Sequence, residues 1–176
     1  MKDFIKQLYK SLYKEDLIQT VTVEYCAPIV IPPKTNREKL FDTAVSFLGK
    51  DASPKDYASD EYGCMESVDS IHFACFGSYI KSTDTIPSIK TAQTYPVLQK
   101  TFTEVTEPME GDIVISPTGY GNGKVTSGHI GIMGRSNIIM SNNSSNGKFE
   151  ENYTTTTWKN YFVTKGGFPM KFFRKT

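Results

Sequence analysis

The order of apolar and polar residues predicts helices in the first half of the chain and strands in the second. Apolar side chains recur at helical spacing over residues 2–18, 36–48 and 64–79. Residues 21–31 are β-branched and apolar, which is typical of an extended segment. Residues 81–110 show little periodicity and are expected to form a long polar connection. Short strand patterns then follow at 112–116, 129–133, 137–142, 161–164 and 170–174.

Helices followed by strands indicate an α+β domain in which N-terminal helices pack on an antiparallel sheet. We place this domain at residues 36–176. Residues 1–35 are interpreted as an appendage made of one amphipathic helix and one extended segment that the prolines at 32 and 33 close.

The composition and charge of the chain argue against several classes of function. The chain has 176 residues, 38% of them hydrophobic, and a formal net charge of +1, which suits one compact domain that we expect to be a monomer. Lysine and arginine are scattered, which argues against nucleic acid and membrane surfaces as partners. No apolar run approaches the roughly 18 residues that span a bilayer. Residues 1–17 carry charges throughout, so we expect no secretory signal and cytoplasmic synthesis.

Cysteine and histidine are scarce, which limits the chemistry. The three cysteines, Cys26, Cys64 and Cys75, are odd in number and form no C-x-x-C motif, so neither a disulfide framework nor a zinc ribbon is expected. With only His72 and His129 as imidazoles, a metal site built on histidine is nearly excluded. We expect no metal and no cofactor.

Cys64 is the candidate nucleophile. The helical pattern begins at this residue, directly after the loop-like residues 50–63. Unpaired backbone N–H groups and the positive end of the helix dipole favour a thiolate at such a position. Cys26 and Cys75 are interpreted as small buried hydrophobic residues instead.

His129 is the candidate base for Cys64. His72 lies eight residues after Cys64 on the same predicted helix, roughly 12 Å along its axis, and cannot reach that thiol. It could touch Cys75, three residues on, but a pair in the middle of a helix lacks the electropositive helix start. His129 lies on a predicted strand after Gly128, and a histidine there is the one that can complete a Cys-His pair.

Asn142 is the candidate third residue, by strand register. If residues 134–137 form an even hairpin loop, Gly134 pairs with Asn137 and His129 lies opposite Asn142. An odd loop or a bulge would shift the partner to Ser141 or Asn143. The alternative interpretation is that residues 141–146 are only a polar turn.

Three segments now resemble one known family. Residues 63–68 (GCMESV), 111–115 (GDIVI) and 127–132 (SGHIGI) occur in the order found in the NlpC/P60 and CHAP cell-wall peptidases. These cysteine peptidases share a papain-like α+β core, and the chain looks most similar to phage-borne peptidoglycan hydrolases over residues 36–174. The resemblance implies an antiparallel sheet with the nucleophile at a helix start.

The sequence departs from the family pattern at several points. The usual Asp-Cys-Ser-Gly is Gly-Cys-Met-Glu at 63–66. The third catalytic position, often His in one branch and Glu or Asn in the other, would be Asn142, and Trp158 matches a later aromatic of the phage enzymes. The tyrosine that commonly precedes the cysteine could be Tyr57 or Tyr62, so the side-chain oxyanion donor is unassigned.

The resemblance implies that the protein hydrolyses an amide bond of bacterial peptidoglycan through a thioester, as an endopeptidase or an amidase. It would then act at the cell wall after release by a lysis pathway or delivery by an injection machinery. A papain-like protease or acyltransferase on another substrate would use the same residues. A catalytically idle wall-binding or virion module is the non-enzymatic alternative. Residues 1–35 could be a packing element, a partner-binding helix or part of a wall-targeting device.

Overall fold

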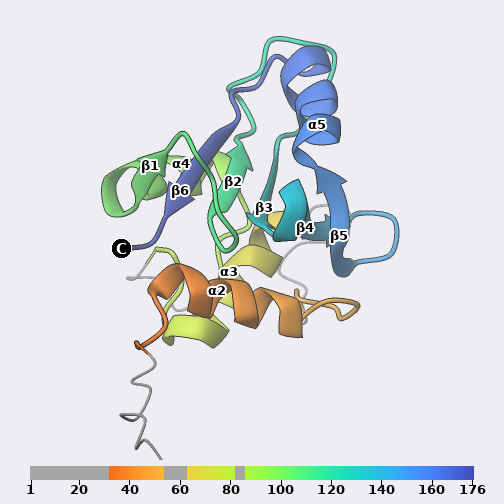
Figure 1. Ribbon diagram of the computed structural model, residues 1–176. Coiled ribbons are helices and arrows are strands. Elements are labelled where there is room, and N and C mark those ends of the chain that lie inside the picture. The colour runs from red at the N-terminus through yellow and green to blue at the C-terminus, as the bar shows by residue number, and fades with distance from the viewer. Residues whose placement is uncertain (1–31, 54–62, 82–85) are drawn as a thin grey trace, which may run out of the picture. The chain divides into compact units, whose positions relative to one another are not determined.

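The computed structural model describes residues 32–53, 63–81 and 86–176 (Figure 1). The chain divides between Pro32 and Pro33 into two units, and the second unit carries the elements below. The helix predicted at 2–18 and the extended segment predicted at 21–31 lie outside the described residues.

The second unit combines helices with one antiparallel sheet (Figure 1). The helices are α2 (Asn36–Ser46), α3 (Cys64–Phe76), α4 (Thr91–Thr101) and the short α5 (Thr155–Trp158), with a 3-10 turn η3 (Arg135–Asn137) and a π-helical segment η4 (Lys159–Lys165). The strands are β1 (Thr103–Val105), β2 (Ile113–Ser116), β3 (His129–Met133), β4 (Ile138–Asn143), β5 (Lys148–Thr154) and β6 (Lys171–Arg174). The six strands pair in the order β1-β6-β2-β3-β4-β5, all antiparallel. The predicted α+β class is confirmed.

Helix α2 begins at a capping box. The Thr35 hydroxyl accepts a hydrogen bond from the backbone N–H of Glu38, and the Glu38 carboxylate accepts one from the N–H of Thr35. Two N–H groups that a helix start leaves unpaired are thereby satisfied. Leu40 and Ala44 then turn the apolar face of the helix into the core.

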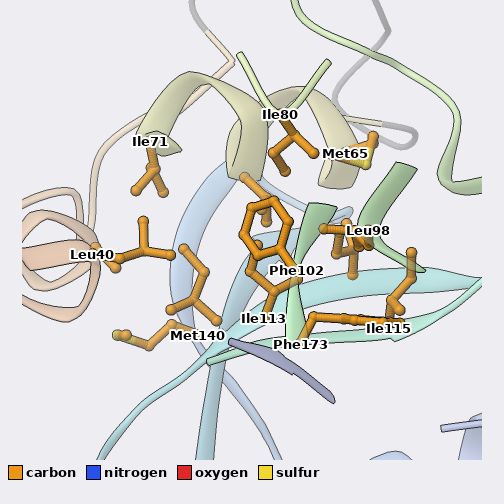
Figure 2. Packing of buried hydrophobic residues seen from close by; sticks show 14 of the residues in the cluster. Leu40, Met65, Ile71, Ile80, Leu98, Phe102, Ile113, Ile115, Met140 and Phe173 are labelled. Carbon is orange, nitrogen blue, oxygen red and sulfur yellow. The ribbon is translucent and has the colours of Figure 1, made fainter. Parts of the chain in front are cut away.

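The alternation of side chains along the strands builds two cores, one on each face of the sheet. Ile113 and Ile115 of β2 face α2, α3 and α4, whereas Val114 between them faces α5 and η4. Figure 2 shows the larger core, in which side chains from three helices meet the sheet. The labelled members are Leu40, Met65, Ile71, Ile80, Leu98, Phe102, Ile113, Ile115, Met140 and Phe173. The smaller core contains Val114, Met133, Ile139, Trp158, Phe162 and Phe168.

The Gly-Asp pair before β2 has a structural role. The Asp112 side chain is fully buried and accepts hydrogen bonds of 2.9 and 2.7 Å from two nitrogens of the Arg174 guanidinium. It also accepts one from the backbone N–H of Met109. Gly111 has φ +85, and a Cβ there would lie 2.0 Å from the carbonyl oxygen of Arg37, so only glycine fits this turn. The motif therefore ties the start of β2 to the C-terminal strand.

The prediction of a long polar connection at 81–110 is wrong, because this stretch contains α4 and β1. Pro96 lies inside α4, where it lacks the N–H that a helix needs, and this obscures the helical pattern. Tyr95 and Leu98 are buried in the larger core. Tertiary packing therefore stabilises a helix that its own residues only weakly favour.

The strand predicted at 161–164 is also wrong, and β5 was not predicted. The aromatic and β-branched residues at 161–164 belong to η4, where the Phe162 ring packs 4.7 Å from the Trp158 ring. Strand β5 has a polar sequence in which Phe149 is the one fully buried side chain. In both segments, contacts with neighbouring elements outweigh the local propensity.

Candidate active site

Cys64 is the first residue of α3 and follows Gly63, as the sequence predicted. Behind it, Met65, Val68 and Ile71 anchor the helix in the larger core. Gly63, the N-cap residue, has no side chain with which to cap the first N–H groups of the helix. The sulfur is held at a helix start whose own position is set by buried contacts.

His129 is the first residue of β3, and its ring lies against aromatic residues of β5, α5 and η4. The centroid distances are 5.5 Å to Tyr153, 5.2 Å to Trp158 and 5.4 Å to Phe162, whose ring is nearly parallel to the imidazole at 12°. Trp158 is itself fixed by a 2.9 Å hydrogen bond from its indole nitrogen to the Ser116 hydroxyl. The imidazole is therefore held on its flanks by rigid rings.

The structure brings Cys64 and His129 to one cleft of about 900 Å³, since each is the first residue of its element and these elements pack on each other. The β3–β4 ladder pairs Ile132 and Met133 but does not extend to Ile130. The backbone N–H of Ile130 is instead directed to the Cys64 sulfur. The other lining residues are Ile89, Lys90, Thr91, Ala92, Thr118, Lys124, Val125, Thr126, Ser127, Gly128, Asn142, Ser144, Tyr153, Tyr161 and Phe162.

Burial keeps both reacting groups neutral. Desolvation raises the pKa of the Cys64 thiol to about 11, although N–H groups of Ile130, Met65 and Cys64 itself favour the thiolate. The helix start thus favours the thiolate as expected, but burial opposes it and desolvation is the larger effect. Desolvation likewise lowers the pKa of His129 to about 4. At pH 7 the cleft of the free protein is therefore lined by a thiol and a neutral imidazole.

The register that pointed to Asn142 is wrong by one residue. The hairpin loop is odd, with Arg135–Asn137 between Gly134 and Ile138, and Ile132 pairs with Met140. Ser136 and Asn137 have positive φ values of 52 and 64, which allow this tight turn. Continued past the ladder, this register places Asn143 opposite His129, the alternative that an odd loop implies.

Asn142 nevertheless lines the cleft, and the two alternatives do not. Its side chain is 1% exposed, and its Oδ1 accepts a 3.5 Å hydrogen bond from the Ser67 hydroxyl of α3. The Asn143 side chain bonds Glu150 and Ser145, and the buried Ser141 hydroxyl has no hydrogen-bond partner in the part of the chain that the structure describes. Nε2 of His129 is buried and has no hydrogen-bond partner among the described residues.

Tyr153 is a cleft residue that sequence reasoning missed. It lies on β5 and its ring meets His129 edge to face. Its phenol has a raised pKa, first because of burial, then because of Tyr161 and of a charge on Cys64. The phenol therefore stays protonated at neutral pH and lines the same cleft as Cys64. No local pattern marks it, since β5 reaches the cleft only through its pairing with β4.

The tyrosines considered before the nucleophile, Tyr57 and Tyr62, lie outside the described residues, and so does Cys26. In the described ranges, no group of three or more His, Cys, Asp or Glu side chains could hold a metal ion. No helix in those ranges is both long and apolar enough to cross a membrane. Comparison with family models, curated proteins and solved structures finds no match for this chain.

Proposed function

We propose that this protein is a cysteine hydrolase that cleaves an amide bond of bacterial peptidoglycan, on a papain-like core of the NlpC/P60 type. The observation that carries the proposal is the meeting of Cys64 and His129 in one open cleft, at a helix start and a strand start. The substrate class comes from the resemblance at residues 63–68, 111–115 and 127–132. Helices packed on one face of an antiparallel sheet are compatible with such a core.

The neutral resting pair sets the order of proton transfers. As the Cys64 sulfur attacks the amide carbon, the thiol proton moves to His129, and the C–S bond forms. His129 then gives this proton to the leaving nitrogen as the C–N bond breaks, which leaves a thioester. Water next attacks the thioester carbonyl, with its proton taken by His129 and returned to the departing sulfur.

Donors for the oxyanion come from two places. The backbone N–H groups at the start of α3 receive no capping bond from Gly63, and such groups stabilise negative charge that develops on a carbonyl oxygen. The Tyr153 phenol is protonated and lines the cleft together with Cys64, so we assign it the unfilled role of side-chain donor. Asn142, held by Ser67, is assigned to position His129 during turnover.

The test compares two cysteines of one helix. Cys64→Ala should lower the rate of turbidity loss of purified peptidoglycan by at least about 10⁴-fold, because removal of the nucleophile stops covalent catalysis. Cys75→Ser should retain most of the rate, with circular dichroism confirming that both variants fold. Mass spectrometry of the wild-type fragments names the bond. Full activity of Cys64→Ala, or hydrolysis of casein with no hydrolysis of peptidoglycan, would contradict the proposal.

A further inference from the structure

Two lysines lie on the lining of the cleft that contains Cys64 and His129. Lys90 and Lys124 are exposed, and neither forms an ion pair with a described residue. Among the described lining residues there is no Asp or Glu. The described wall of the cleft therefore carries positive charge that nothing on it neutralises.

A short chain of hydrogen bonds joins the residue after Lys90 to the residue before His129. The next residue, Thr91, donates from its hydroxyl to the Thr118 hydroxyl at 3.1 Å and accepts from the Thr118 N–H at 3.0 Å. The backbone N–H of Gly128 donates to the same Thr118 hydroxyl at 3.0 Å. Gly128 precedes His129, so the start of α4 is fixed relative to the reacting groups.

Lys124 lies on a loop whose backbone is also fixed. Its N–H donates to the carbonyl oxygen of Lys165 at 2.8 Å, and the N–H of Gly123 donates to that of Gly166 at 2.9 Å. A Cβ at Gly123 would lie 2.0 Å from the Lys165 carbonyl oxygen, so glycine is required for this close approach. The second lysine therefore projects from a loop docked on η4.

The surroundings of both lysines favour an anion as well. Thr126 and Ser127, both exposed, add hydroxyl groups to the lining. Lys90 is the N-cap residue of α4, and its side chain makes no capping hydrogen bond. The N-terminal end of a helix carries partial positive charge, which adds to the positive charge of the lysines. Ammonium groups and hydroxyls together are donors that a carboxylate can accept from.

We infer that the cleft binds its substrate through a carboxylate held by Lys90 and Lys124, so that the preferred substrate is an acidic stem peptide with free carboxyl groups. This inference rests on the proposed peptidoglycan hydrolase function and specifies its substrate. A wall whose stem peptides carry carboxamides in place of carboxylates is a poor substrate. The lysines act in binding, and Cys64 and His129 act in the chemistry.

The experiment uses two soluble probes that contain every candidate amide bond. They are cross-linked disaccharide-tetrapeptide dimers with all peptide carboxyl groups free, and the same dimers with each carboxyl group converted to a carboxamide. At low salt, the wild type should prefer the free acid by about tenfold in kcat/KM, and added salt should reduce this preference. In the Lys90→Met/Lys124→Met double variant, the preference should fall below about twofold, with the change in KM rather than in kcat.

The matched control is Lys39→Met, which removes an exposed lysine of α2 that does not line the cleft. It should keep the wild-type preference. Equal turnover of the two dimers by the wild type, or an unchanged preference in the double variant, overturns the inference and leaves the proposed function intact.

Binding to Cys64→Ala, measured by calorimetry, separates failure of the inference from failure of the proposed function. If neither dimer is turned over but the free acid binds more tightly than the carboxamide, and only when both lysines are present, the hydrolase proposal fails and the carboxylate site stands. If neither dimer is turned over and the two bind equally, both are overturned.

Discussion

Helix α3 carries two cysteines, and comparing each with the histidine that we considered for it contrasts the candidate active site with a packed core. Cys64 at its first turn shares a cleft with His129, whereas Cys75 lies near its end, three residues after His72. Burial lowers the pKa of both histidines to about 4, and Nε2 of each is buried without a hydrogen-bond partner among the described residues. A shifted pKa therefore does not distinguish them.

The two histidines differ in whether the ring lines the cleft and in the hydrogen bonding of Nδ1. His72 is 1% exposed, and its Nδ1 makes a 2.7 Å hydrogen bond to the Ser78 carbonyl oxygen, so this ring is closed into the core. Phe76 and Phe102 cover it, with the Lys175 ammonium over both phenyl rings. His129 opens on the cleft instead. Desolvation lowers the pKa of both rings, but only the His129 ring lines the cleft.

The largest expected contrast is between the two histidines. His129→Ala should lower kcat/KM on peptidoglycan by about 10³-fold, because general acid–base catalysis is lost. His72→Ala should leave kcat/KM of the folded protein within about twofold and lower its melting temperature, since it opens a cavity in the core. Peptidoglycan turnover and thermal unfolding check both variants. A loss of activity in His72→Ala as large as that in His129→Ala would remove the distinction.

The pH dependence of stability tests what the two histidines share. Both have a folded pKa of about 4, below the usual 6.5, so the fold holds the neutral rings. The free energy of unfolding therefore includes a contribution from each neutral ring that is complete above pH 6.5. This contribution, about 3 kcal/mol per histidine, is lost as the pH falls toward 4.

Urea unfolding between pH 7 and pH 4 measures this loss. Carboxylates also titrate in this range, so the quantity to compare is the difference between the wild type and His72→Gln or His129→Gln. Each variant should lose less stability on acidification than the wild type. An unchanged slope in either variant would contradict the assignment of a buried neutral ring at that position.

Tyr153→Phe removes the phenol from the cleft and keeps the ring against His129. We expect kcat to fall by about 10²-fold, the cost of one oxyanion donor, with little change in KM. Tyr120→Phe is the control, because Tyr120 packs on Tyr95 and does not line the cleft. A rise in KM with unchanged kcat would make Tyr153 a substrate-binding residue.

The smallest expected effect is the difference in kcat between variants of Asn142 and Asn143. Asn142→Ala should lower kcat by about tenfold, which corresponds to one hydrogen bond that orients the imidazole. Asn143→Ala should instead lower stability slightly, because its amide bonds Glu150. Steady-state kinetics and thermal unfolding of both variants show which asparagine affects turnover and which affects stability. A larger kinetic loss in Asn143→Ala would move the positioning role to the residue that the extended register places opposite His129.

How far the sequence predicted the fold depended on which contacts fix each element. Helix α3 and strand β3 follow from their own patterns, since the apolar face of α3 and the alternation at 129–133 already mark what each buries. Helix α4 with its internal Pro96, the π-helical η4 and the polar β5 could not be predicted in this way. Their conformation depends on partners that are distant in the sequence.

For the candidate site, too, the sequence predicted the local features and not those that depend on distant contacts. The sequence by itself determined that Cys64 begins a helix and that His129 begins a strand, because helix starts and strand alternation are local properties. Only the tertiary structure decided the rest. Packing between distant segments sets the one-residue shift in register and brings Tyr153 and both lysines to the cleft. The same packing excludes water from Cys64, which keeps its thiol neutral.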